Sequence, residues 1–222
     1  MIQLDNVIRS NLIGHGSNAY VYKNGSLSYK EYMDGCYNRI KREVFESLKD
    51  IDHPNFIKLR DLYHIDDKVM GYSYDYVNQS DKLMIDMPID YTYQTLYQLR
   101  SLLSELSKRK ILIDDENYNN VIVGNDSLVI IDPDMYRCHK SEDYVKRENI
   151  SLIMGYLTTL WGEEYIKKHG IKYCKYFNYD YNALDEYFDR YSIRDIEGDI
   201  SDKLNTNTLD ELISNVVKKR IP

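Results

Sequence analysis

Carboxylate and amide side chains mark the ends of two short apolar runs in the middle of the chain. Asp115 lies in a polar loop, Asn120 opens the first apolar run, and Asp132 closes the second. The two runs predict a small hairpin, which brings an amide oxygen and a carboxylate to one end, beside the loop carboxylate. Hard cations such as Mg²⁺ prefer oxygen ligands of this kind, often shared with substrate phosphates. The pattern therefore fits a magnesium site, and it fits a polar loop followed by an Asp-Pro turn equally well.

Two glycines and a lysine near the N-terminus suit the binding of a phosphate. Gly14 and Gly16 lie between two predicted strands, where bare backbone N–H groups can approach a phosphate closely. Lys30 lies on the third predicted strand. A carboxylate of the following helix can hold this lysine by an ion pair; Glu43 is the candidate and Glu46 its competitor. Taken singly, each feature has an ordinary alternative: a hairpin turn, a solvent-exposed lysine or a solvated helical glutamate.

The elements that must position these residues follow from the spacing of the apolar side chains. Short apolar or tyrosine-rich runs, separated by turn residues, predict three strands, one helix and two further strands. Their ranges are 6–12, 19–23, 26–32, 37–51, 56–63 and 68–77.

The chain after residue 77 has a different pattern. Apolar residues at helical spacing predict three helices that flank the small hairpin. They lie around Leu96–Leu106, from Asn149 onward, and after the capping box Thr208-x-x-Glu211. Strand-rich and helix-rich halves predict an α+β fold. We expect an antiparallel five-stranded lobe with one helix over residues 1–77 and a mainly helical lobe over residues 78–222, together forming one domain.

In this order the motifs resemble those of the protein-kinase-like superfamily. Gly14-x-Gly16-x-x-Ala19-x-Val21 resembles the glycine-rich loop, with alanine in place of the third glycine. Lys30 matches the third-strand lysine that contacts the α- and β-phosphates of ATP, and Glu43 matches its partner on the helix. The resemblance implies the two-lobed kinase-like fold and a binding site for ATP.

The segment 71–77 resembles the hinge that holds adenine by backbone hydrogen bonds. Tyr74 stands at the gatekeeper position, and Asp75 and Tyr76 follow it. The resemblance implies that these three residues line the adenine site.

The polar loop and hairpin resemble the catalytic loop of the family. Asp115 matches the catalytic aspartate, Asn120 the metal-binding asparagine, and Asp132 the metal-binding aspartate. The pair Asp114 and Asn119 has the same spacing. We favour Asp115 with Asn120 because in the family a strand begins directly after the asparagine, and here an apolar run follows Asn120.

The departures from the family pattern bear on substrate and control. Asp114 replaces the arginine that receives a phosphorylated activation loop, so control by such phosphorylation is not expected. Pro133 and Asp134 replace the Phe-Gly that usually follows the metal-binding aspartate. The proline stiffens this turn. Asp134 adds a weaker candidate metal ligand, as in small-molecule kinases of the superfamily. Asn117 replaces a lysine usual in protein Ser/Thr kinases. About sixteen residues separate Asp132 from the helix near Asn149, which leaves little room for a peptide-docking segment.

The resemblance implies an ATP- and Mg²⁺-dependent phosphotransferase. We expect a protein Ser/Thr kinase that lacks a usual activation segment, similar to reduced bacterial kinases with a minimal C-terminal lobe. A small-molecule kinase is the alternative, and a pseudokinase that acts as a binding module is a third. A module would not need Lys30, Asp115, Asn120 and Asp132 together, which argues against it.

Composition restricts the other function classes. The 222 residues carry 29 basic and 36 acidic side chains, a net charge of −7, so a broad nucleic-acid interface is not expected. No pair among Cys36, Cys138 and Cys174 has metal-site or redox spacing, which favours a reduced, cytoplasmic location. No run approaches the ~20 apolar residues of a membrane helix, and the first residues lack a secretory signal pattern. We therefore expect a nucleotide and a hydroxyl acceptor as partners, with no nucleic acid and no membrane.

Overall fold

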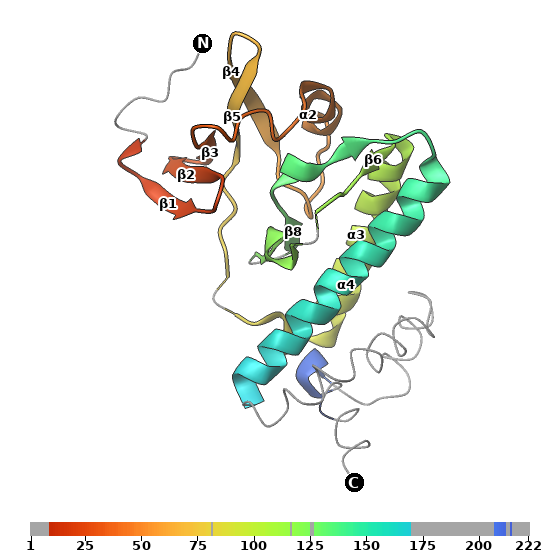
Figure 1. Ribbon diagram of the computed structural model, residues 1–222. Helices are drawn as coiled ribbons and strands as arrows, with labels where there is room; N and C mark the ends of the chain where they lie inside the picture. The colour runs from red at the N-terminus through yellow and green to blue at the C-terminus, as the bar shows by residue number, and fades with distance from the viewer. Residues whose placement is uncertain are drawn as a thin grey trace.

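The structure, a computed structural model, describes residues 9–80, 82–115, 117–124, 127–169, 207–211 and 214. Its first part is a five-stranded antiparallel sheet in the order β1-β2-β3-β5-β4 (Figure 1). The strands are β1 (Leu12–His15), β2 (Ala19–Asn24), β3 (Leu27–Tyr32), β4 (Leu59–Ile65) and β5 (Lys68–Asp75), and α2 (Arg42–Lys49) connects β3 to β4. The predicted α+β class and the five-stranded antiparallel sheet are confirmed.

The turn between β2 and β3 forms as its residue types predict. Asn24 pairs with Leu27 across the hairpin, and Gly25 adopts a φ of 59°, a conformation that costs glycine little. The tight turn keeps β3 in register with β2, so Val21 lies opposite Lys30. Alternation along β3 then places Ser28, Lys30 and Tyr32 on its buried face.

Two predicted boundaries near the N-terminus are wrong. The first strand begins at Leu12, where the prediction ended it, and so includes Gly14; residues 1–8 lie outside the described residues. The helix begins at Arg42 instead of Tyr37. Asn38, with a φ of 61°, accepts a hydrogen bond from the backbone N–H of Val69 at 2.7 Å. This tertiary contact holds the preceding segment in a turn, and the helix starts only after it.

The segment His53-Pro54-Asn55 fastens the sheet to the second half of the chain. Asn55 is fully buried and donates from Nδ2 to the carbonyl oxygen of Leu128 at 2.6 Å. Backbone hydrogen bonds join Asn55 and Ile57 to Ile130. Phe56 and Ile57 therefore pair with the later hairpin instead of extending β4, which begins at Leu59.

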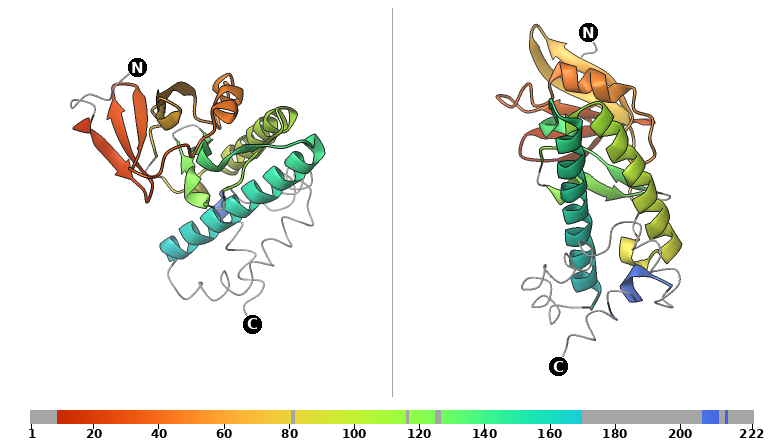
Figure 2. Two further views of the ribbon diagram at one scale, coloured as in Figure 1. Left: turned by 45° about the horizontal axis from the view of Figure 1, so that its top comes forward. Right: turned by 90° about the vertical axis from the view of Figure 1, so that its right-hand side faces the viewer.

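The second part is built on two long helices that pack side by side (Figure 2). These are α3 (Ile89–Lys108) and α4 (Glu142–His169). Between them the chain forms two short strand pairs: β6 (Ile111–Leu112) with β9 (Arg137–Cys138), and β7 (Val121–Val123) with β8 (Leu128–Ile130). The same region contains the short helices η2 (Tyr118–Asn120) and η3 (Pro133–Met135). A further short helix, η1 (Met84–Asp86), precedes α3. The predicted hairpin is confirmed.

Helix α4 begins seven residues earlier than predicted, at Glu142 instead of Asn149. Its fully buried residues include Val145, Asn149 and Ile153, one turn apart, so the buried stripe starts before the predicted first residue of the helix. The connection from Asp132 to this helix is therefore shorter than expected, and it spans only residues 133–141.

The described C-terminal residues return to the start of α3. Ile89 donates its backbone N–H to the carbonyl oxygen of Asn207 at 2.8 Å. Glu211 donates its N–H to Thr208 Oγ1 at 3.3 Å, while its own carboxylate accepts from the N–H of Asn207 at 2.7 Å. The predicted cap at Thr208 is confirmed, with the reciprocal bond one residue earlier than in a standard capping box. Cys174 lies outside the described residues.

Within the part of the chain that the structure describes, no helix is long and apolar enough to cross a membrane.

Candidate active site

Lys30 lies in the middle of the sheet and is 7% exposed. Its Nζ is 2.5 Å from Asp132 Oδ1 and 2.8 Å from Asp134 Oδ2. Strand β5 passes close behind it, because Gly71, with a φ of 155°, allows the backbones to approach. A Cβ on Gly71 would lie 2.0 Å from the carbonyl oxygen of Lys30. The fold thus places a nearly buried ammonium against two carboxylates from the second half of the chain.

Asp132 is positioned by an unusual backbone conformation after β8. Its φ is 60° and its ψ is 71°, in the left-handed region, and Pro133 follows at the start of η3. Such a conformation costs roughly 1–2 kcal/mol in a residue other than glycine. It turns the carboxylate towards Lys30, and Tyr72 Oη lies 3.5 Å from the same oxygen. The Asp132 side chain remains 31% exposed, so one side of it faces solvent.

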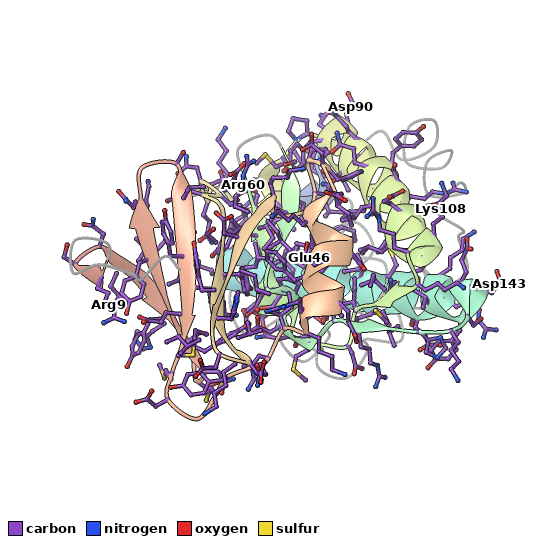
Figure 3. The ribbon with its side chains drawn as sticks, turned by 90° about the horizontal axis from the view of Figure 1, so that it is seen from above. Arg9, Glu46, Arg60, Asp90, Lys108 and Asp143 are labelled. Carbon is purple, nitrogen blue, oxygen red and sulfur yellow. The ribbon has the colours of Figure 1, made fainter. Side chains whose placement is uncertain are left out.

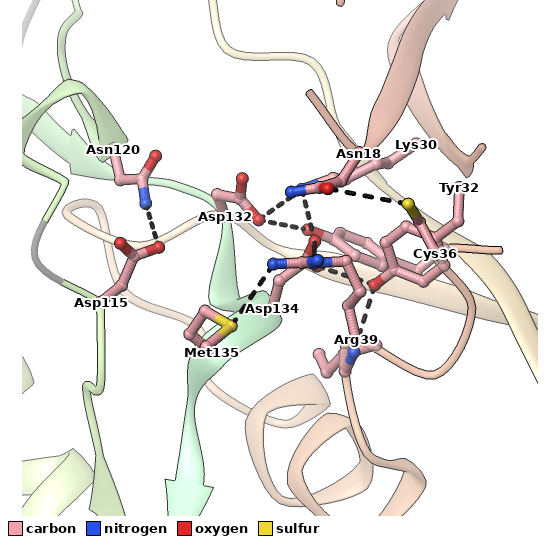
Figure 4. A network of polar contacts seen from close by, with 12 residues as sticks. Asn18, Lys30, Tyr32, Cys36, Arg39, Asp115, Asn120, Asp132, Asp134 and Met135 are labelled. Carbon is pink, nitrogen blue, oxygen red and sulfur yellow. Dashed lines mark hydrogen bonds and ion pairs between the residues drawn. The ribbon is translucent and has the colours of Figure 1, made fainter. Parts of the chain in front are cut away.

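Asp134 is buried and has donors on both oxygens. Tyr32 Oη donates to Oδ1 at 2.7 Å, and Oδ2 faces Lys30. Arg39 Nε stands 3.9 Å away. Burial raises the pKa of the Asp134 carboxyl, and the nearby Lys30 charge opposes this shift. Both oxygens are directed at β3 and the loop after it (Figure 4).

Asp115 and Asn120 meet at the same end of the β7–β8 hairpin as Asp132. Asn120 donates from Nδ2 to Asp115 Oδ2 at 2.7 Å, and the N–H of Asn117 donates to Oδ1 at 3.0 Å. The carbonyl oxygen of Asn120 accepts from the N–H of Ile131 at 2.7 Å, so Asn120 lies beside the end of β8 that leads into Asp132. Figure 4 shows Asp132 between this pair and Lys30.

The other pair with the same spacing does not come together. Asp114 forms an ion pair with Arg137 at 3.2 Å, and the Asn119 amide donates to Asn117 Oδ1 at 2.9 Å. Strand β7 begins directly after Asn120, as the choice of Asp115 with Asn120 requires. Within the described residues, no three His, Cys, Asp or Glu side chains are grouped closely enough to hold a metal ion among themselves. A cation at Asn120 and Asp132 would therefore need ligands from a substrate or water.

Glu43 does not contact Lys30, and the predicted ion pair is wrong. Glu43 is exposed on α2. Glu46, which is labelled in Figure 3, is an exposed residue of the same helix. The reason is the rotation of the helix: α2 begins at Arg42 and buries Val44, Phe45 and Leu48, which turns the glutamates towards solvent.

The glycine-rich segment forms the hairpin between β1 and β2. Gly16 donates its N–H to the carbonyl oxygen of Ala19 at 3.0 Å, and Gly14 pairs with Val21 beside a bulge. Neither glycine has a positive φ, and a Cβ at either would meet nothing within 4 Å. The fold itself therefore does not require glycine at these two positions.

The predicted hinge residues are largely engaged within the sheet. Asp75 donates its N–H to the carbonyl oxygen of Lys58 at 2.9 Å, and Tyr76 donates its N–H to that of Ser26 at 2.8 Å. Neither N–H is available to a base in this conformation, which contradicts an adenine contact through them. Tyr74 is partly buried on β5, and burial raises its pKa to about 12.

Sequence reasoning missed two kinds of supporting residue. Tyr32 and Tyr72 are buried around the Lys30 ammonium, which lies 6.0 and 5.8 Å from their ring centres. Asn149 is fully buried on α4; its Oδ1 accepts from Ile113 N–H at 2.9 Å, and its Nδ2 donates to the Ile111 carbonyl at 3.0 Å. A lone amide within an apolar helical stripe was the available signal for Asn149.

Two cavities lie away from these charged groups. The first, about 660 Å³, lies between the turn after α2 and the polar face of α3. The second, about 630 Å³, is lined by residues of the segment 79–83, by Val121 and Val123 of β7, and by α4. Neither of these two cavities is lined by Lys30, Asp115 or Asp132.

Comparison with protein-family models gives no match for this chain, and comparison with curated proteins gives none. The contacts described above are therefore the basis for any assignment of function.

Proposed function

We propose that the chain is an ATP- and Mg²⁺-dependent phosphotransferase with a kinase-like arrangement of two lobes. The observation that carries this proposal is the convergence of Lys30, from the five-stranded sheet, with Asp132, from the end of β8. The two residues are 102 positions apart in the chain, yet their charged atoms are 2.5 Å apart. The hydrogen-bonded pair of Asp115 and Asn120 at the same hairpin supplies the remaining polar groups that the resemblance assigns to catalysis.

The residues have distinct roles in this proposal. Lys30 binds the α- and β-phosphates, and Asn120 and Asp132 hold the metal ion, which supplies charge neutralisation at the phosphates when bound. Asp115 orients the acceptor hydroxyl or accepts its proton. Gly14 and Gly16 offer bare backbone to the phosphates; the lack of any packing or dihedral reason for glycine there supports this role.

The acceptor is a hydroxyl group, on a protein Ser/Thr side chain or on a small molecule. A specific observation favours the small molecule as the second candidate. The connection from Asp132 to α4 spans residues 133–141, and part of it is held as β9 against β6. So short and so paired a segment offers little surface on which a peptide could lie.

Thermal unfolding with ATP, in Mg²⁺ or in EDTA, tests the nucleotide and metal roles. A ligand at ~100 times its Kd stabilises the folded state by about 2.7 kcal/mol. In a chain of this size that is a rise in Tm of roughly 5–10 °C. We expect this rise for the parent in Mg²⁺ only. Asp132→Asn should respond as the parent does in EDTA, whereas the exposed control Asp61→Asn on β4 should behave like the parent.

The absence of any ATP-dependent rise in the parent would refute nucleotide binding, and an equal rise in Asp132→Asn would refute the metal role. Intact-mass spectrometry after incubation with ATP and Mg²⁺ then identifies the acceptor class. A phosphoryl group added to this chain or to an added protein indicates a protein kinase; ATP consumption only with an added small alcohol indicates a small-molecule kinase.

A further inference from the structure

The Lys30 ammonium needs a counter-ion, because a charged group this well buried is costly without one. Three carboxylates are candidates by position: Glu43, Asp132 and Asp134. Glu43 is exposed and has no contact with Lys30, so the choice is between the two aspartates after β8.

The surroundings of Asp134 hold its carboxylate in place against Lys30. Its side chain is 6% exposed, and Lys30 Nζ is 2.8 Å from Oδ2. Its Oδ1 is held by the Tyr32 hydroxyl at 2.7 Å, and that hydroxyl in turn accepts the N–H of Ile40 at 3.3 Å. Because every one of these contacts is buried, the carboxylate cannot turn towards solvent without breaking its contacts to both Lys30 and Tyr32.

The surroundings of Asp132 allow its carboxylate to move away from Lys30. It also contacts Lys30, but its side chain is 31% exposed. The hydrogen bond that Asp132 accepts from the Tyr72 hydroxyl is long, at 3.5 Å. When Asp132 turns to a cation on its exposed side, Asp134 still neutralises the lysine.

We propose that Asp134, and not Glu43, is the positioning residue for Lys30, and that Asp132 is thereby left free to serve as the metal carboxylate. The proposal deepens the phosphotransferase function and rests on it for the roles of the phosphates and the metal. It also means that the Lys30–Asp134 pair joins β3 to η3 without any contact from the Glu43 side chain of α2.

A double-mutant cycle tests the Lys30–Asp134 pair without any ligand. Lys30→Met, Asp134→Asn and the double variant are unfolded in urea and followed by circular dichroism. Asp134→Asn leaves Lys30 with only its contact to Asp132, and Lys30→Met leaves the buried Asp134 without its ammonium partner, whereas the double change removes both charges of the pair. We expect the double variant to be more stable than additivity predicts by at least ~10-fold in the unfolding constant, about 1.4 kcal/mol. The control cycle, Lys30→Met with Glu43→Gln, should be additive within about 2-fold.

If Asp134→Asn does not fold, recovery of folding in the double variant would demonstrate the same coupling between Lys30 and Asp134. Additive behaviour of the Lys30–Asp134 cycle, failure of the double variant to recover, or equal coupling in the Glu43 cycle would overturn the proposal.

Nucleotide affinity distinguishes positioning from mere stabilisation and from metal binding. We expect Asp134→Asn to raise the Kd for ADP about 10-fold in both Mg²⁺ and EDTA, with the affinity for adenosine unchanged, because Lys30 contacts only the phosphates. Asp132→Asn should weaken ADP binding only in Mg²⁺. Tyr32→Phe removes the hydroxyl that donates to Asp134 Oδ1 and provides a milder variant. Its control is Tyr37→Phe, which removes a hydroxyl bonded to the exposed Asp34.

A loss confined to Mg²⁺ would make Asp134 a metal ligand, and an equal loss for adenosine would make its role structural; both results would overturn the proposal. If the parent binds no ADP, the proposed function fails, while the unfolding cycle still decides whether Asp134 is the partner of Lys30.

Discussion

Replacing Gly71 by alanine tests how closely β5 must approach β3 behind Lys30. The added Cβ would lie 2.0 Å from the Lys30 carbonyl oxygen and 3.2 Å from Glu31 Cα, both backbone atoms of the neighbouring strand. Because these atoms cannot rotate away, the strands must separate by about 1 Å, an overpacking that costs about 1–3 kcal/mol. The φ of 155° adds about 1–3 kcal/mol for a residue with a Cβ.

The expected loss is therefore about 4 kcal/mol, a large part of the ~5–15 kcal/mol by which domains are stable. Urea unfolding followed by circular dichroism measures it, and the matching fall in Tm is roughly 10 °C. Gly155→Ala is the control, because Gly155 lies in α4 and its Cβ would meet nothing within 4 Å. That change should stabilise the chain by about 0.5–1 kcal/mol. A Gly71→Ala variant within 1 kcal/mol of the parent would refute the reasoning.

Three further predictions concern the loop, its support and a histidine. Asp115→Ala should abolish phosphoryl transfer and leave ATP affinity nearly unchanged, whereas Asp114→Ala should retain activity because the Asp114 carboxylate faces Arg137. ATP-consumption assays compare the two variants. Loss of activity in Asp114→Ala alone would favour the pair Asp114 and Asn119 as the catalytic-loop residues. Asn149→Ala should destabilise the chain by about 2–3 kcal/mol in urea unfolding, because two buried backbone groups lose their partners; a loss under 1 kcal/mol would contradict this. Burial lowers the pKa of His53 from 6.5, so the unfolded chain binds a proton first as the pH falls through 6.5; stability should therefore decline below this pH, and His53→Gln should flatten that decline in urea unfolding.

Local features of the site were predictable from the sequence. The Asn24-Gly25 turn, which sets the register of β3 against β2, was predicted from its residue types. The pairing of Asp115 with Asn120 was also predictable, because both lie within one short loop and an apolar strand follows directly. In each case the contacts involved join residues close in the chain, where residue type limits the backbone to few conformations.

One of the displaced boundaries has an explicit tertiary cause. The first strand, the start of α2 and the start of α4 were each displaced from their predicted ranges. At α2 the reason is explicit: Asn38 bonds to Val69, a residue 31 positions away, and this contact keeps the chain out of a helix. Local spacing carries no information about a partner so distant.

The sequence by itself determined which chemical groups the chain has and which of them are neighbours along it: a strand lysine, a loop aspartate with its asparagine, and two aspartates flanking a proline. Only the tertiary structure decided which carboxylate meets the lysine. Glu43 is 13 positions from Lys30 and turns away, whereas Asp134 is 104 positions away and lies within 2.8 Å. The physical reason is that an ion pair depends on ångström-scale distance and on burial. Both are set by the rotation of α2 and by the left-handed turn at Asp132, which no local pattern of residues specifies.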